Sequence, residues 1–200
     1  PSSVTTIRGY AFKGCTSLTS VIIPSSVVDI GFEAFNGCTS LTSVIIPSLV
    51  TKIGFEAFCD CASLTSVIIP SSVTDIGLAA FKGCTSLMSV TIPSSVTKLI
   101  SGTFFYCLSL TSVAIPSSVT MIDTQTFTEC AITAITIPTT CTLRPLAFDT
   151  KVTIIRLTPD RMEFCYRLAT FVRWRHALKF CKPQLFAWYE RAALKSGSFS

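Results

Sequence analysis

The stretch that decides the fold is residues 18–38, LTSVIIPSSVVDIGFEAFNGC, because close copies of it follow one another along most of the chain. Its proline and its cysteine each occur at six positions with a constant spacing of 23 residues. A fixed period in the range of about 20–50 residues is typical of solenoid proteins, in which each repeat forms one coil. The positions are Pro1, Pro24, Pro47, Pro70, Pro93 and Pro116, and Cys15, Cys38, Cys61, Cys84, Cys107 and Cys130.

The first half of the unit predicts a strand. Leu18, Val21 and Ile23 follow the L-x-x-L-x-L spacing that leucine-rich repeats use for their strand. Pro24 then ends the strand, because proline has no N–H to donate to a ladder. Strands of successive coils would lie about 4.8 Å apart. Stacking therefore builds a continuous core, which no single unit is large enough to form.

The second half of the unit predicts a return path and a turn. Val27 and Ile30 supply a second short apolar edge. Residues 32–35, FEAF, followed by NGC predict one helical turn that Gly37 closes, because glycine is the residue that most often ends a helix. We therefore expect each coil to contain a strand, a second apolar edge and one helical turn.

The repeated phrase resembles the BspA-type leucine-rich repeat, whose pattern is roughly L-x-x-I-x-I-P-x-x-V-x-x-I-G-x-x-A-F-x-x-C, and residues 64–84 show it well. The resemblance covers residues 1–158 in about seven units. It implies an α/β repeat fold, a right-handed leucine-rich-repeat solenoid with a parallel strand ladder. Residues 99–107, LISGTFFYC, lack the Ile-Gly step, and Pro145 stands where an aromatic residue is expected. The repeat is therefore expected to become irregular towards its C-terminal end.

The resemblance also implies a class of function. The family includes surface-exposed proteins of microbes and protists that act in adhesion and interaction. A location at the cell surface or outside the cell is the corresponding expectation. The chain begins at Pro1 in the middle of a phrase, so further repeats could precede it, and a cytoplasmic location stays open.

Residues 159–200 form a second segment that differs from the repeats in charge. Residues 1–158 hold eight Lys/Arg and eight Asp/Glu, whereas residues 159–200 hold eight Lys/Arg and three Asp/Glu, which places the whole net charge of +5 there. Start and stop signals predict one helix from Pro159 and a second over residues 184–195, which would form a helical cap on the last coil. The basic side chains could also contact a membrane surface. They do not gather on one helical face, so nucleic acid is not the expected partner.

Ten cysteines occur, six of them in the 23-residue period. Their side chains would all point the same way into the core, so we expect free buried thiols that act as small apolar fillers. Cys59 and Cys141 lie off this period and are the candidates for reactive thiols. Cys165, His176 and Cys181 lack the spacing of a zinc site, so we expect no metal and no other cofactor.

The sequence does not predict an enzyme. His176 is the only histidine, and no serine lies in a G-x-S-x-G motif. The acidic residues change position from unit to unit, whereas a glycosidase needs two fixed carboxylates. The expected function is therefore that of a non-catalytic recognition or adhesion module without a small-molecule substrate.

The strands also predict where a partner would bind. Because side chains alternate along a strand, Val21 and Ile23 facing inward would leave Ser20 and Ile22 facing outward. Repetition turns these positions into a polar row beside an apolar row, and solenoids commonly bind partners on such an extended surface. The expected partner is a protein or a cell-surface macromolecule. The candidate partner-binding residues are Ser20, Ile22, Ser43, Ile45, Ser66, Ile68, Ser89 and Thr91.

A structural role is the alternative. If the first strand has no covering unit, its free edge could pair with another chain and lead to self-association.

Overall fold

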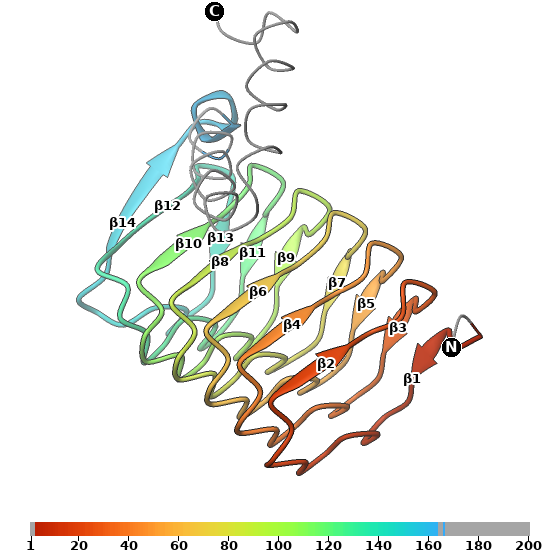
Figure 1. The fold of residues 1–200 in the computed structure, drawn as a ribbon. Helices are drawn as coiled ribbons and strands as arrows, with labels where there is room; N and C mark the ends of the chain where they lie inside the picture. The colour runs from red at the N-terminus through yellow and green to blue at the C-terminus, as the bar shows by residue number, and fades with distance from the viewer. Residues whose placement is uncertain (1–2, 164–165, 167–200) are drawn as a thin grey trace, which may run out of the picture.

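The computed structural model describes residues 3–163 and Tyr166, and it shows a solenoid of stacked coils (Figure 1). Most coils contribute one strand to a front ladder and one strand to a rear ladder. Every strand pair of the described residues is parallel. The predicted parallel ladder is therefore confirmed.

The front ladder is formed by the strand that the first half of each unit predicts. Its register stacks identical residues, for example Ser43 beside Ser66 and Val44 beside Val67. The sequence period therefore becomes a row of equal side chains on each face. The strands are β2 (Ser20–Ile22), β4 (Ser43–Ile45), β6 (Ser66–Ile68), β8 (Ser89–Thr91) and β10 (Ser112–Ala114), followed by the separate pair β12 (Ala134–Pro138) and β14 (Thr153–Leu157).

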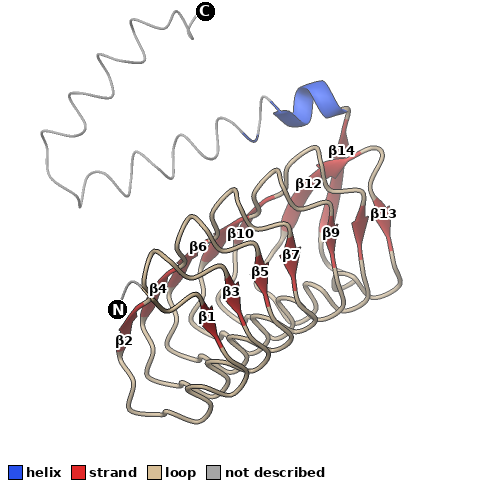
Figure 2. Ribbon diagram, turned by 90° about the vertical axis from the view of Figure 1, so that its right-hand side faces the viewer, coloured by secondary structure: helices blue, strands red, loops and turns tan. Residues whose placement is uncertain are grey.

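The rear ladder is formed by the second apolar edge of each unit. Each strand has two residues, and the second of them is apolar and is buried in all but β13. Figure 2 shows these strands along the side of the solenoid that lies at the right in Figure 1. The rear ladder has two parts that are not paired with each other. The first sheet is β1 (Thr6–Ile7), β3 (Asp29–Ile30), β5 (Lys52–Ile53) and β7 (Asp75–Ile76), and the second is β9 (Lys98–Leu99), β11 (Met121–Ile122) and β13 (Thr142–Leu143).

The core between the ladders contains a column of phenylalanine rings, one from each coil. Phe58 is fully buried, and its ring centroid lies 5.1 Å from that of Phe35 and 5.4 Å from that of Phe81. The ring planes are nearly parallel, as offset stacking of aromatic rings requires. The column consists of Phe12, Phe35, Phe58, Phe81, Phe104, Phe127 and Phe148.

The helical turn that was predicted over residues 32–38 is wrong. Glu33 has φ of 50° and Gly37 has φ of 74°, so two residues of this segment lie in the left-handed region. Their N–H groups turn away from the local chain and donate to the next coil, Glu33 to the carbonyl of Phe55 at 2.7 Å and Gly37 to that of Cys59 at 2.8 Å. Hydrogen bonds between coils therefore replace the hydrogen bonds of a helix.

Glycine at the end of the rear strand is required by the distance between coils. A Cβ atom on Gly54 would lie 2.6 Å from the backbone carbon of Gly31, and one on Gly77 would lie 2.4 Å from that of Gly54. No rotamer change relieves a contact with backbone, so the coils themselves would have to separate.

We therefore expect Gly54→Ala to lower the free energy of unfolding by about 3 kcal/mol, the upper end of the range for overpacking. The matched control is Gly14→Ala, because Gly14 has φ of 71° but no heavy atom within 4 Å of the added Cβ. We expect the control to lose only the about 1–2 kcal/mol of unfolding free energy that a left-handed alanine costs. Urea unfolding followed by circular dichroism measures both, and equal losses would contradict a steric role for Gly54.

The front ladder is interrupted between β10 and β12 because one unit is a residue short. Pro138 follows Cys130 after eight residues, whereas Pro116 follows Cys107 after nine. Within the described part of the chain, β12 pairs with β14 and has no pairing with β10. A cavity of about 200 Å³ lies at this break.

The chain leaves the ladder after β14 and enters a helix at residues 159–163, with Tyr166 also helical (Figure 2). Arg156 of β14 contacts the turn before β13, since its Nη1 donates to the carbonyl oxygen of Cys141 at 2.8 Å. The predicted start of a helix at Pro159 is confirmed. The predicted second helix and the basic side chains beyond Tyr166 lie outside the described residues. Among the described residues, no helix is long and apolar enough to cross a membrane.

Candidate interaction face

The outward side chains of β2, β4 and β6 form a two-row surface, which we call the open sheet face. The apolar row is well exposed, with fractions of 95% for Ile22, 75% for Ile45 and 69% for Ile68. The inward neighbours Val44 and Val67 are buried, with only 4% of each residue exposed. The alternation along the strands therefore turns the isoleucines towards solvent. The second row consists of the exposed residues Ser20, Ser43 and Ser66.

The open sheet face carries no charge. Residues 15–28, 38–51 and 61–74, which contain its three strands and their flanking turns, include no Asp, Glu, Lys or Arg. Every charged residue between positions 3 and 150 lies on a rear strand or on the turn that follows it. Over residues 3–150 the solenoid therefore has an uncharged front and an ionic rear. Contacts on this part of the front depend on apolar surface and hydroxyl groups.

A threonine row borders the open sheet face and is fixed in orientation. The hydroxyl of Thr42 donates to the carbonyl of Thr19 at 3.2 Å, and that of Thr65 donates to the carbonyl of Thr42 at 3.3 Å. Since these protons are used between coils, the hydroxyl oxygens face solvent as acceptors. The border of the face is therefore a regular set of acceptors with little side-chain entropy to lose.

At the other end of the same ladder, two helical residues of the chain itself lie against the strands. Met162 is 2% exposed, and Met162 and Tyr166 line the cavity at the break together with residues of β10 and β12. The Tyr166 hydroxyl donates to the carbonyl oxygen of Ile92, just after β8, at 2.8 Å. Two of the predicted site residues, Ser89 and Thr91, are half-buried in this region. The structure therefore separates them from the six that are exposed on the open sheet face.

The ladder thiols are part of the core. The thiol of Cys61 donates to the carbonyl of Phe35 at 3.2 Å, and that of Cys84 donates to the carbonyl of Phe58 at the same distance. Burial raises the pKa of both thiols, that of Cys84 well above its usual range. The eight described cysteines are all free thiols. The ladder cysteines therefore pack as protonated side chains, with Cys15 exposed at the first coil.

The prediction that Cys59 and Cys141 are reactive thiols is wrong. Both are only 3% exposed. Burial, with a further contribution from Asp60 and Glu56, raises the pKa of Cys59 to about 12. Burial also raises the pKa of Cys141, although Arg156 acts in the opposite direction. Leaving the 23-residue period did not bring these side chains to the surface, because each fills a different buried position of its coil.

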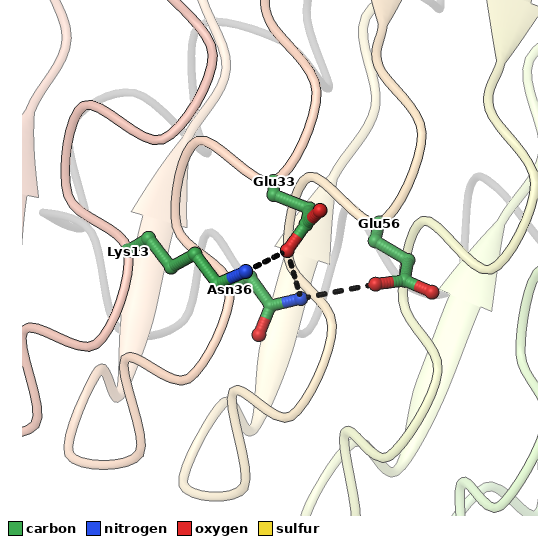
Figure 3. Close-up of polar contacts among 4 residues, drawn as sticks. All are labelled: Lys13, Glu33, Asn36 and Glu56. Carbon is green, nitrogen blue, oxygen red and sulfur yellow. Dashed lines mark hydrogen bonds and ion pairs between the residues drawn. The ribbon is translucent and has the colours of Figure 1, made fainter.

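A polar cluster on the rear turns was not predicted from the sequence. The Asn36 amide donates to Glu33 at 3.2 Å and to Glu56 at 3.1 Å, and Lys13 forms an ion pair with Glu33 (Figure 3). The four side chains come from three successive coils and neutralise one another in part. Among the described residues, no group of three His, Cys, Asp or Glu side chains is arranged to hold a metal ion. The cluster therefore links three successive coils by hydrogen bonds and one ion pair.

A second exposed apolar row lies beside this cluster, and it too was missed. Phe32 is 48% exposed, Phe55 42% and Leu78 44%, and they occupy equivalent positions of three successive coils. Tyr10 packs edge-on against Phe32 with 4.6 Å between ring centroids. Their recurrence after Gly31, Gly54 and Gly77 was the available signal. Unlike the open sheet face, this row has charged neighbours.

Comparison with protein families gives a match over most of the chain. The family described as "BspA type Leucine rich repeat region" matches in six copies, over residues 1–99 and 28–155. No curated protein matches the chain significantly.

Solved structures of bacterial leucine-rich repeat proteins resemble the fold. A leucine-rich repeat protein of T. pallidum is 31% identical, with a TM-score of 0.63 over 82% of this chain and 76% of that one. A leucine-rich cell surface protein of Faecalibacterium prausnitzii is 42% identical, with a TM-score of 0.66 over 76% of this chain. The match spans 43% of the length of that second protein. A leucine-rich repeat protein of Eubacterium ventriosum is 27% identical, with a TM-score of 0.53 over 70% of this chain and 44% of that one.

Proposed function

The chain belongs to the BspA-type leucine-rich repeat family, and from that premise we propose that it is a recognition module that binds a partner macromolecule through the open sheet face. The observation that carries the proposal is the row of Ile22, Ile45 and Ile68, which are 95%, 75% and 69% exposed on an uncharged surface. An exposed apolar patch with a polar border is a usual mark of a contact site. The family and its structural neighbours are repeat proteins suited to interactions.

The rigidity of the face favours binding. Its backbone is held in parallel ladders on both sides of β4, and the bordering threonine hydroxyls are bonded between coils. A surface that is already ordered loses little conformational entropy when a partner docks. The open sheet face can therefore convert modest apolar contact into net affinity.

The size of the face sets the strength of a single contact. Three strands spaced about 4.8 Å apart, with two outward-facing residues each at a spacing of about 6.8 Å, span on the order of 200 Å². A standard protein interface buries about 800 Å² on each partner. One open sheet face thus supports a weak contact, and tight attachment requires several contacts in parallel. Such attachment suits adhesion at a cell surface, and the Faecalibacterium prausnitzii neighbour is itself a cell surface protein.

The test is capture of partners from the surface fraction of the source cells by three versions of the immobilised chain. The first is the parent, the second carries Ile22→Lys, Ile45→Lys and Ile68→Lys, and the third is a matched control. The control carries Thr51→Lys, Thr74→Lys and Thr97→Lys, which add the same charge at exposed positions beside the rear ladder.

We expect the parent and the threonine control to retain the same partner and the isoleucine variant to lose it by about tenfold or more, as is usual when central contact residues are replaced. Circular dichroism checks that both variants are folded. Equal capture by all three versions would show that the open sheet face is scaffold alone.

A further inference from the structure

We propose that the open sheet face accepts an amphipathic helix of a partner protein, laid across β2, β4 and β6 with one uncharged apolar side against Ile22, Ile45 and Ile68. This inference rests on the proposed function and specifies the form of its partner. It follows from the chain's own packing on the same ladder, from the spacing of the isoleucine row and from the absence of charge on the face.

The chain already shows this packing mode next to the open sheet face. The helical residues Met162 and Tyr166 are four positions apart, so they lie on one side of the helix about 6 Å from each other. Met162 lines the cavity at β10 and β12, and Tyr166 reaches the carbonyl oxygen of Ile92 after β8. The described residues of the helix therefore lie against the front ladder in the region of β8, β10 and β12. The open sheet face is the continuation of that ladder by three more strands.

The spacing of the row fits a helix better than an extended chain. The isoleucines succeed one another by one strand, which is about 4.8 Å. One turn of a helix advances about 5.4 Å, so a tilt of about 27° from the row brings successive turns into register. An extended peptide repeats a side chain on one face only every 6.8 Å or so. It would have to lie at about 45° to the row to bring successive side chains into register, a larger tilt than the helix needs.

The side chains differ between the covered and the open part of the ladder. Where the chain's own helix lies, the position equivalent to the isoleucines is occupied by Thr91, Ala114 and Thr136. These are shorter side chains, and Ala114 and Thr136 line the same cavity as Met162 and Tyr166. On the open sheet face the same position holds isoleucine each time. These side chains protrude and can fit between the side chains of a partner helix.

The sequence favours a partner protein over the chain's own C-terminal segment as the occupant. Residues 159–200 hold eight Lys/Arg and three Asp/Glu. Cationic side chains would lose their hydration against a face that holds no acidic residue. A partner helix with apolar residues at i, i+4 and i+7 has no such penalty, and its binding is expected to be insensitive to salt.

The experiment is selection of random 16-residue peptides displayed on phage against the full chain, with the triple isoleucine-to-lysine variant as the counter-target. We expect the enriched peptides to carry apolar residues at i, i+3 or i+4, and i+7. Synthetic copies should gain helical circular dichroism on binding. Fluorescence anisotropy should show at least about tenfold weaker binding to the isoleucine variant, unchanged binding to the Thr51, Thr74 and Thr97 control, and similar affinity in about 0.05 M and 0.5 M NaCl.

Enriched peptides whose apolar residues alternate with period two would overturn the helix and show an extended ligand. The absence of any enrichment that depends on the isoleucines would overturn it as well. Both results are distinct from failure of the proposed function, which is decided by natural partners in the capture experiment. A natural partner that needs the isoleucines, together with period-two peptides, would leave the function standing and remove the helix.

Discussion

Replacing Phe58 by alanine is expected to lower the free energy of unfolding by about 3–5 kcal/mol. The ring is 0% exposed and is stacked between Phe35 and Phe81 at centroid distances of 5.1 Å and 5.4 Å. Its removal leaves a cavity in the middle of the column, and the neighbouring rings cannot move into it without separating from the next coils. Urea unfolding of the parent and the variant measures the loss.

Phe55 provides the matched control because it is the same residue type three positions earlier in the same coil. Its side chain is 42% exposed, so Phe55→Ala removes about half as much buried surface and creates no closed cavity. We expect a loss of about 1 kcal/mol, the usual size for a single substitution. Equal losses for Phe55→Ala and Phe58→Ala would contradict the phenylalanine column as the centre of the core.

Stability is expected to fall steeply above the ordinary thiol pKa of 9.0. Burial raises the pKa of the thiols in the folded chain, whereas the same thiols ionise normally once the chain unfolds. The folded state therefore keeps protons that the unfolded state releases, and the free energy of unfolding decreases as the pH rises. A thiol whose folded-state pKa lies well above 9.0, such as that of Cys84, contributes at most about 1.4 kcal/mol per pH unit once the pH exceeds 9. Below pH 8 the contribution is fully present and constant.

Urea midpoints at pH 8, 9, 10 and 11 measure this slope. Lysine and tyrosine also titrate in this window, so the informative quantity is the difference in slope between the parent and a single-thiol variant. Cys84→Ala should reduce the slope by about 1.4 kcal/mol per pH unit, since alanine has no proton to release. Cys15→Ala is the control, because Cys15 is exposed. A slope that is the same in the parent and in Cys84→Ala would contradict a buried, protonated thiol at position 84.

Much of the fold could be predicted from the sequence because successive units can be aligned with one another inside the same chain. The 23-residue period fixes which residues stack, and the alternation of Val21, Ile22 and Ile23 fixes which side faces the core. The strand at Ser20–Ile22 and its pairing with Ser43–Ile45 follow from these two facts. Local propensity failed at residues 32–38, where FEAF suggested a helix. The conformation of that segment is set by hydrogen bonds to the next coil, which the sequence of a single unit does not reveal.

The open sheet face could be predicted for the same reason, but its limits could not. The sequence pattern continues the candidate rows through Ser89 and Thr91, which the structure shows to be half-buried. Their surroundings depend on Met162 and Tyr166, residues about seventy positions away. The single missing residue between Cys130 and Pro138 was visible as a slip in the period, yet its consequence, the break between β10 and β12, depends on coil packing.

The uncharged front of the solenoid explains why the choice of face has consequences for specificity. Contacts on the ionic rear turns, near Glu33 and Glu56, would respond to salt and to the charge of the partner. Contacts on the open sheet face would respond to shape, to apolar area and to hydrogen bonds with its hydroxyl groups. A partner bound through the open sheet face therefore has to match a repeated pattern of side chains, which is the property that distinguishes a repeat surface from a single pocket.

The most direct test of the claim that the open sheet face is the contact surface is site-specific photo-crosslinking on the source cells. A photoreactive residue is placed either at position 45, on the open sheet face, or at position 74, exposed beside the rear ladder. The account predicts a cross-linked partner from position 45 and none from position 74. Cross-linking of the same partner from position 74, with none from position 45, would place the contact on the opposite side and contradict the account.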